Sequence, residues 1–123
     1  MFYRIAICDD NQADIGYLLD IVKKWEKEQQ LELKIDTFSS AEAFLFYYAE
    51  NKTYDMLLLD IEMEKMDGVT LARTIRKENE TVQIIFITGY SEYIAEGYEV
   101  AALHYLMKPV REEKLKEVLN RAK

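Results

Sequence analysis

The chain contains few of the residues that build disulfide frameworks or zinc-type metal sites, because its 123 residues include one cysteine and one histidine. Cys8 has no partner for an internal disulfide and lies within an apolar run, so we interpret it as a core packing residue. His104 has no acidic residue near it in the sequence, and we interpret it as a surface or packing residue rather than a catalytic one. These shortages exclude a disulfide scaffold and a cysteine-histidine metal cluster.

Basic residues and long apolar runs are also scarce. The chain has 16 lysines and arginines against 23 aspartates and glutamates, a formal net charge of −7. Affinity for a nucleic-acid backbone comes from neutralising phosphates with Lys and Arg, so we expect no nucleic-acid binding by these residues. The apolar runs are far shorter than a bilayer span, and Asp9-Asp10 ends the first of them, unlike a signal peptide. We therefore expect a cytoplasmic protein without membrane contact.

The composition, 50% apolar and 32% charged, is that of one globular domain covering residues 1–123. Five short apolar segments alternate with five segments of helical periodicity. The segments predicted as strands are 3–8, 33–36, 56–59, 84–87 and 103–107. The segments predicted as helices are 13–28, a stretch from Ser39 or Ser40 to about 50, 69–76, 92–99 and 111–121. This alternation implies an α/β fold, a doubly wound five-stranded parallel sheet with helices on both faces.

The apolar patterns also limit the possible orders of the strands. The first, third and fourth strands are apolar throughout and belong in the centre of the sheet. The second strand alternates between apolar and polar residues and the fifth contains His104, so both suit the edges. The order 2-1-3-4-5 meets these requirements, as do others, and we choose it because it is the order of flavodoxin-like sheets.

A polar residue directly follows each of four predicted strands. These residues are Asp9 with Asp10, then Asp60, Thr88 and Lys108. In open α/β sheets, ligand crevices form outside the carboxyl ends of the strands where the strand order reverses, here between the first and third strands. We expect the five side chains to converge there, although position alone also allows Asp60 to be a helix cap or turn residue.

Three carboxylates packed together would repel one another unless a cation lies among them. Oxygen ligands without histidine or cysteine suit a hard ion, Mg²⁺ or Mn²⁺. This combination indicates phosphoryl transfer, with Asp60 as the nucleophile and Lys108 neutralising the phosphoryl oxygens. Thr88 and the backbone NH groups of Glu62 and Gly89 would donate hydrogen bonds to those oxygens.

These residues, in this order and spacing, resemble the receiver domain of bacterial two-component response regulators, and the resemblance covers the whole chain. The motifs that carry it are Asp9-Asp10, Asp60, Met66-Asp67-Gly68, Thr88-Gly89, Tyr105 and Lys108-Pro109. By this resemblance Asp60 accepts a phosphoryl group from a histidine kinase in phosphorelay signal transduction. The resemblance also implies that the domain dephosphorylates itself slowly and is not a turnover enzyme.

The resemblance further implies a set of metal ligands. Asp10, Asp60 and the backbone carbonyl of Glu62 would bind Mg²⁺ directly, and Asp9 would act mostly through water.

Two backbone features are expected beside these motifs. The Asp67-Gly68 pair marks a turn, and we expect a positive φ at Gly68, where glycine adopts that conformation without steric cost. The resemblance, together with a tight turn after the fifth strand, predicts a cis peptide bond between Lys108 and Pro109.

The run from Phe86 to Tyr93, with Tyr98 and the segment 102–106, resembles receivers of the LytTR (LytR/AlgR) class. Members of that class carry a DNA-binding output domain and regulate transcription. The 123 residues contain no such domain, so we interpret the chain as an excised receiver. The alternative is a stand-alone receiver that acts through protein-protein contacts.

The positions of Thr88 and Tyr105 on neighbouring strands predict a switch. Phosphorylation would draw Thr88 toward the phosphoryl group, let Tyr105 rotate inward, and reshape the face made by 92–99, 103–107 and 111–121. We expect this face to form a homodimer, with Tyr98, Lys114, Glu117 and Arg121 on it.

Two other functions fit parts of the pattern. A phosphatase of the haloacid dehalogenase family also uses a nucleophilic aspartate, but that family has Asp-x-Asp after its first strand and a cap insertion. This chain has adjacent Asp9-Asp10 instead. A flavodoxin-like cofactor binder needs a phosphate loop rich in glycine and hydroxyl groups, and Asp9-Asp10-Asn11-Gln12 would repel phosphate there.

Overall fold

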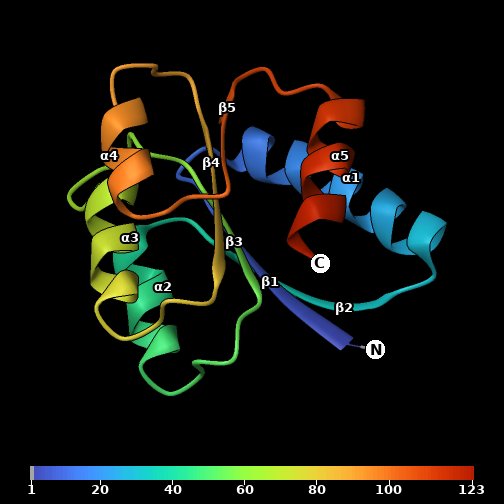
Figure 1. Cartoon of the computed structure of the whole chain (residues 1–123), viewed down its shortest axis with the longest axis horizontal. Helices are drawn as coiled ribbons and strands as arrows, with labels where there is room; N and C mark the ends of the chain where they lie inside the picture. The colour runs from blue at the N-terminus through green and yellow to red at the C-terminus, as the bar shows by residue number, and fades with distance from the viewer. Residues whose placement is uncertain (1) are drawn as a thin grey trace.

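The structure is a computed structural model that describes residues 2–123. Its five strands form one parallel sheet in the order β2-β1-β3-β4-β5 (Figure 1). The strands are β1 (Phe2–Cys8), β2 (Glu32–Phe38), β3 (Met56–Leu59), β4 (Gln83–Thr88) and β5 (His104–Met107). The helices are α1 (Gln12–Gln29), α2 (Ala41–Tyr48), α3 (Gly68–Arg76), α4 (Ile94–Glu99) and α5 (Glu112–Ala122). The predicted doubly wound fold and strand order are confirmed.

Helices cover both faces of the sheet. In Figure 1, α2, α3 and α4 lie on one side of it, and α1 and α5 lie on the other. Alternate residues of β3 enter opposite cores, since Leu57 and Leu59 pack toward the first group of helices and Leu58 packs toward the second. A strand that is apolar at every position therefore belongs in the centre of this sheet, and all four residues of β3 are buried.

The two edge strands have the mixed character that the sequence predicts. Residues of β2 alternate between exposed and half-buried over most of its length, and β5 contains one buried residue, Leu106. Cys8 is fully buried, as expected for a packing residue. His104 is half-buried on β5 with its Nε2 2.8 Å from Nη1 of Arg121, which agrees with a surface or packing role.

Two helix boundaries differ from the predicted ones by about two residues, and the boundaries of α1, α3 and α5 differ by at most one. α2 ends at Tyr48 rather than near 50, and α4 begins at Ile94 rather than 92. The start of α2 is fixed by Ser40, whose side chain accepts a hydrogen bond from the backbone NH of Ala43. α4 has no such side-chain cap, which explains why its start was harder to place from the sequence.

The expectation of a positive φ at Gly68 was wrong. Gly68 is the first residue of α3, and the left-handed residue of this loop is Lys65, with φ 62°. Glycine is needed at 68 for a different reason, because a Cβ there would lie 1.9 Å from the carbonyl oxygen of Asp60. The close approach of two backbones, rather than a turn conformation, excludes a larger residue.

A buried charge anchors the edge of the sheet away from the strand ends that carry the acidic residues. The guanidinium of Arg4 forms an ion pair with Asp36 on β2, at 3.3 Å, and lies 4.4 Å from the centroid of the Tyr54 ring. Tyr54 donates a second hydrogen bond to Asp36, at 2.7 Å. The polar atoms of these three side chains bond to one another, so we infer that the cluster stabilises the fold.

None of the helices within residues 2–123 combines the length and the apolar character that a membrane crossing would require.

Candidate functional site

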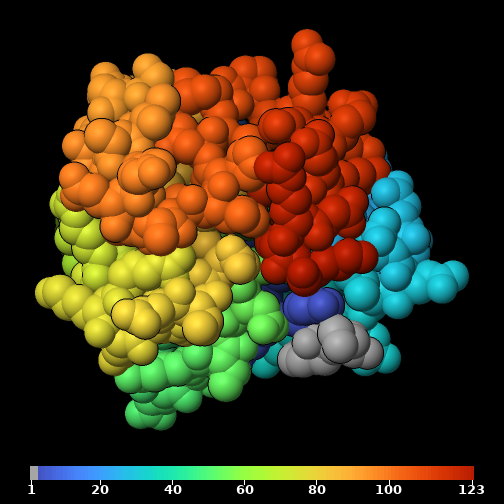
Figure 2. All heavy atoms as spheres, viewed as in Figure 1, coloured from blue at the N-terminus to red at the C-terminus, as the bar shows by residue number. Residues whose placement is uncertain are grey.

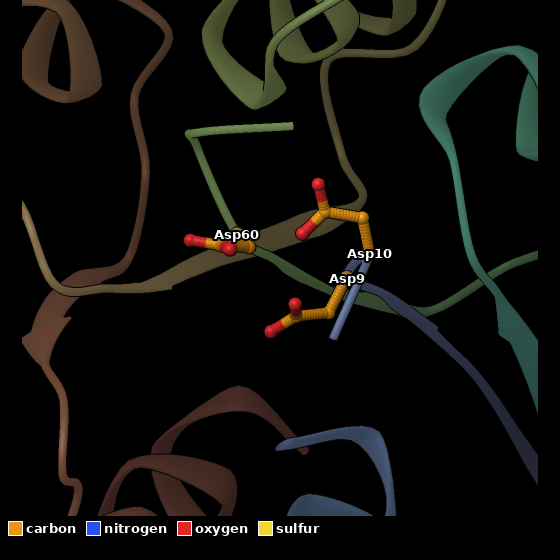
Figure 3. Close-up of side chains that lie close together, drawn as sticks. All are labelled: Asp9, Asp10 and Asp60. Atoms are coloured by element: carbon orange, nitrogen blue, oxygen red, sulfur yellow. The ribbon is translucent and has the colours of Figure 1, made fainter. Parts of the chain in front are cut away.

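Three carboxylates meet where β1 and β3 end. One oxygen from each of Asp9, Asp10 and Asp60 lies within 4.8 Å of the other two (Figure 3). Asp9 and Asp60 are buried, with 1% and 6% of their surface exposed, whereas Asp10 is exposed to solvent. The convergence predicted from strand ends is therefore present in the structure.

The register of the sheet explains this meeting point. Cys8 at the end of β1 pairs with Leu59 at the end of β3, so the residues that follow them emerge side by side. The backbone NH of Asp60 then donates to the carbonyl of Cys8 at 2.9 Å, which extends the ladder by one step. Asp9 is held in the same way by the other neighbour of β1, because its backbone NH donates to the carbonyl of Phe38 at the end of β2, at 3.1 Å.

Lys108 brings a positive charge to the acidic residues. Its Nζ lies 2.8 Å from Asp9, 2.8 Å from Asp14 and 3.3 Å from Asp60. Burial alone would lower the pKa of this ammonium group, but the hydrogen bonds to Asp14 and Asp9 and the charge of Asp60 outweigh burial and raise it. Lys108 is therefore a permanent cation at neutral pH.

The backbone after β5 delivers this side chain. The NH of Lys108 donates to the carbonyl of Thr88 at 2.8 Å, so the residue continues the β4-β5 ladder. The peptide bond between Lys108 and Pro109 is cis, as predicted.

Asp14 was not predicted as a site residue. The sequence placed it only in the first turn of a helix, and its role depends on Lys108, which is 94 residues away along the chain. The one available signal was its position one helical turn after the acidic pair.

Asp60 is in an environment that disfavours its ionised form. Burial raises the pKa of its carboxyl, and the nearby charge of Asp9 raises it further. The Lys108 ammonium, the Thr88 hydroxyl and the NH of Ile61 act in the opposite direction, but they do not cancel the first two effects. The Ile61 NH donates to Oδ1 of Asp60 at 2.8 Å, which leaves Oδ2 facing Lys108.

Thr88 and Tyr105 lie on neighbouring strands, as predicted. Thr88 is fully buried at the end of β4, and its hydroxyl accepts a hydrogen bond from the NH of Tyr90 at 3.4 Å. The hydroxyl of Tyr105 donates to the carbonyl of the same residue, Tyr90. Tyr90 thus connects the hydroxyl of Thr88 to the ring of Tyr105 through one residue of backbone.

Sequence reasoning also missed a contact between the loop that follows Asp60 and the residue that precedes α4. The hydroxyl of Tyr93 donates to the carboxylate of Glu62 at 2.7 Å, and this bond and the charge of Glu62 raise the pKa of Tyr93 to about 12. Both residues are in loops, so no periodicity in the sequence could have paired them.

The donor set at this site fits a hard divalent cation. Every candidate ligand is an oxygen, and two of the three carboxylates are buried, where their mutual repulsion is poorly screened. Among residues 2–123, the ammonium group that faces these carboxylates is that of Lys108, so the acidic residues retain excess negative charge.

Comparison with known proteins agrees with this geometry. The sequence model of the response regulator receiver domain family matches residues 5–120. The transcriptional regulatory protein NatR of Bacillus subtilis is 32% identical over 112 residues, covering 91% of this chain and 46% of NatR. The sensory transduction protein LytT of the same organism is 29% identical over 123 residues, covering 98% of this chain and 48% of LytT. The chain therefore spans about half the length of these curated relatives.

A solved structure provides an independent comparison. The response regulator TrrA from Thermotoga maritima, crystallised in complex with Mg²⁺ and BeF, is 33% identical to this chain and superposes with a TM-score of 0.76. The alignment covers 98% of this chain and 99% of TrrA.

The family match includes residues from all five strands and every polar residue at their carboxyl ends. Relatives named LytT and LytR, together with an alginate biosynthesis regulator, agree with the LytTR class. The chain accordingly belongs to the response regulator receiver domain family.

Proposed function

We propose that Asp60 is the residue of this receiver domain that accepts a phosphoryl group, and that a histidine kinase donates it. The observation that carries the proposal is the position of Asp60 Oδ2, which lies at a strand end, 3.3 Å from Lys108 and beside two further carboxylates. A buried carboxylate with one oxygen free of backbone hydrogen bonds and facing a cation is suited to nucleophilic attack.

The proposed transfer exchanges one bond to phosphorus for another. A carboxylate oxygen of Asp60 forms a bond to phosphorus, and the bond from phosphorus to the histidine nitrogen of the kinase breaks. The histidine nitrogen leaves with its electron pair. Lys108 remains protonated and stabilises the negative charge on the phosphoryl oxygens.

Asp9, Asp10, Asp60 and the backbone carbonyl of Glu62 are the residues we assign to Mg²⁺ or Mn²⁺. When bound, the metal supplies positive charge that neutralises the phosphoryl oxygens. The same carboxylates would otherwise repel an incoming phosphoryl group, so we expect phosphorylation to require the divalent ion.

Thr88 and Tyr105 are assigned to the response that follows. In the phosphorylated domain Thr88 would move toward the phosphoryl group and donate to one of its oxygens. This movement would lengthen the 3.4 Å bond that the Thr88 hydroxyl accepts from the NH of Tyr90 and let Tyr105 turn inward. A hydrogen bond to a charged group contributes about 1.5 to 3 kcal/mol. Taking a two-state equilibrium from 1:99 to 99:1 needs about 5.5 kcal/mol, so Lys108 and backbone donors would supply the remainder.

The surface that would change consists of α4, β5 and α5, which adjoin on the face shown in Figure 2. Ile94, Tyr98 and Met107 are large apolar residues exposed on it. Lys114, Glu117 and Arg121 form a charged row along α5, with Nζ of Lys114 3.7 Å and Nη2 of Arg121 3.8 Å from Glu117. A mixed surface of this kind suits a phosphorylation-dependent homodimer.

The wider role is proposed from the relatives. The chain corresponds in length to about half of NatR and LytT, both described as regulatory or signal-transduction proteins. We assign it to the control of a DNA-binding output domain in the cytoplasm. Receiver domains are generally not turnover enzymes, and we expect slow self-dephosphorylation here.

The proposal is tested by incubating the protein with acetyl phosphate and Mg²⁺ and following its intact mass. One phosphate per chain, reached only with the metal and lost slowly after the donor is removed, is the expected result. Continuous release of inorganic phosphate by an unlabelled protein would identify a phosphatase and overturn the proposal.

A further inference from the structure

We propose that Asp14 is a positioning residue: it holds the Lys108 ammonium in the unphosphorylated domain and competes with the phosphoryl group for it. The inference rests on the proposed phosphorylation of Asp60 and adds a residue outside the three-carboxylate cluster.

The hydrogen bonds of Lys108 are fully used in the unphosphorylated domain. An ammonium group has three N–H donors, and three carboxylates accept from it. The contacts to Asp9 and Asp14 are both 2.8 Å, whereas the contact to Asp60 is 3.3 Å. The donor that now faces Asp60 can pass to a phosphoryl oxygen, but the two shorter bonds hold the ammonium closer to Asp9 and Asp14 than to Asp60. For Lys108 to move closer to the phosphoryl group, one of these two bonds must lengthen or break.

Asp14 is the partner that can release Lys108 at the lower cost. Asp9 is buried and also accepts a hydrogen bond from the NH of Asn11 at 2.9 Å, so it is held in place on both sides. The side chain of Asp14 is 39% exposed, and water can replace the lysine when the bond breaks. A cavity of about 530 Å³ bounded by Asp14, Tyr17 and Lys108 leaves room for its carboxylate to rotate away.

The backbone of Asp14 is fixed relative to Lys108, so the competition depends on the side chain. The NH of Asp14 donates to the side chain of Asn11, which caps α1. Tyr17, three residues further on, donates from its hydroxyl to the carbonyl of Val110 at 2.6 Å. This contact ties the first turns of α1 to the segment that follows Lys108-Pro109.

Removing the charge of Asp14 should therefore favour the phosphorylated form. Asp14→Asn keeps an oxygen acceptor but removes the negative charge that attracts the Lys108 ammonium, so the bond between the two side chains becomes weaker. It also removes one negative charge that faces the phosphoryl group. Asp20→Asn is the matched control, because Asp20 is exposed on the same helix and has no side-chain partner among residues 2–123.

The experiment measures beryllofluoride binding by ¹⁹F NMR at saturating Mg²⁺, for wild type and three variants. We expect Asp14→Asn to reach half-saturation at a beryllofluoride concentration roughly fivefold lower than wild type, because losing one charge–charge interaction near the surface releases Lys108 more easily. Asp20→Asn and the charge-preserving Asp14→Glu should stay within about twofold of wild type.

The role of Asp14 would be overturned if Asp14→Asn and Asp20→Asn bound beryllofluoride with equal affinity, or if Asp14→Asn bound it more weakly than wild type. Absence of binding by wild type would instead overturn the proposed function of Asp60, so the two failures are distinguishable.

Discussion

Tyr93 and Glu62 join the start of α4 to the loop that follows Asp60, because the tyrosine hydroxyl donates to the glutamate carboxylate at 2.7 Å. The backbone of Glu62 is a proposed metal ligand, and α4 is part of the surface proposed to change on phosphorylation. The pair is thus a direct link between the proposed site and the proposed output surface.

Removing this link should loosen the start of α4. We expect Tyr93→Phe to raise backbone hydrogen exchange at residues 90–97, because α4 has no side-chain cap to hold its first turn. Tyr98→Phe is the control, since the Tyr98 ring is 88% exposed and its hydroxyl has no protein partner in the described chain. Identical exchange in the two variants would mean that the Tyr93 bond does not restrain the helix.

Gly68 and Gly16 should respond to alanine in opposite directions. A Cβ at Gly68 would lie 1.9 Å from the Asp60 carbonyl oxygen, so Gly68→Ala should shift that backbone and cost about 3 kcal/mol of unfolding free energy. Gly16 lies within α1, and outside the nearby backbone of that helix no atom lies within 4 Å of the added carbon, so Gly16→Ala should stabilise by about 0.5 to 1 kcal/mol. Urea unfolding measures both, and a neutral Gly68→Ala would contradict the close approach.

The raised pKa of Asp60 predicts how the stability of the fold changes with pH. A carboxyl with a higher pKa in the folded state binds more protons when folded, so its ionisation destabilises the fold as pH rises through that range. Asp60→Asn should therefore be more stable than wild type at neutral pH in EDTA. This gain should disappear as the pH falls below the ordinary aspartate pKa of about 4.

The measurement is urea unfolding at neutral and acidic pH, with Asp20→Asn as the control for loss of a surface charge. Mg²⁺ should reverse the order at neutral pH, because wild type keeps the ligand that the variant lacks. A less stable Asp60→Asn in EDTA at neutral pH would show that Lys108 outweighs burial and Asp9.

Dimerisation through α4, β5 and α5 is tested by light scattering with beryllofluoride and Mg²⁺. Wild type should double its mass when the analogue is bound. Thr88→Ala should respond more weakly because it lacks the hydroxyl, and Thr88→Ser should restore the response. If wild type stays monomeric at high concentration with the analogue bound, the dimer is contradicted. If the mass of Thr88→Ala responds just as that of wild type does, the coupling between Thr88 and the dimer surface is contradicted.

The sheet and the polar residues at its strand ends were predictable from the sequence, because each depends on local pattern. An apolar run such as 56–59 identifies a central strand, and the residue after it falls at the carboxyl edge wherever the helices lie. The contacts of Asp14 and Tyr93 were not predictable in this way. Each depends on a partner on a different element, so only the tertiary arrangement brings the pair together.

Gly68 shows a second limit. The Asp67-Gly68 pair has the composition of a turn with positive φ, but Asp67 caps α3 and accepts from the NH of Thr70 at 2.8 Å. The requirement for glycine comes from the distant backbone of Asp60. The local sequence indicated that this glycine is important, but the reason inferred from it was wrong.

The central claim, that Asp60 accepts the phosphoryl group, is tested most directly by intact-mass spectra of Asp60→Asn and Asp20→Asn after treatment with acetyl phosphate and Mg²⁺. The Asp60 variant keeps the shape of the side chain but lacks the nucleophile, so it should gain no phosphate, while wild type and Asp20→Asn each gain one. A phosphate on Asp60→Asn at the wild-type level would contradict the account.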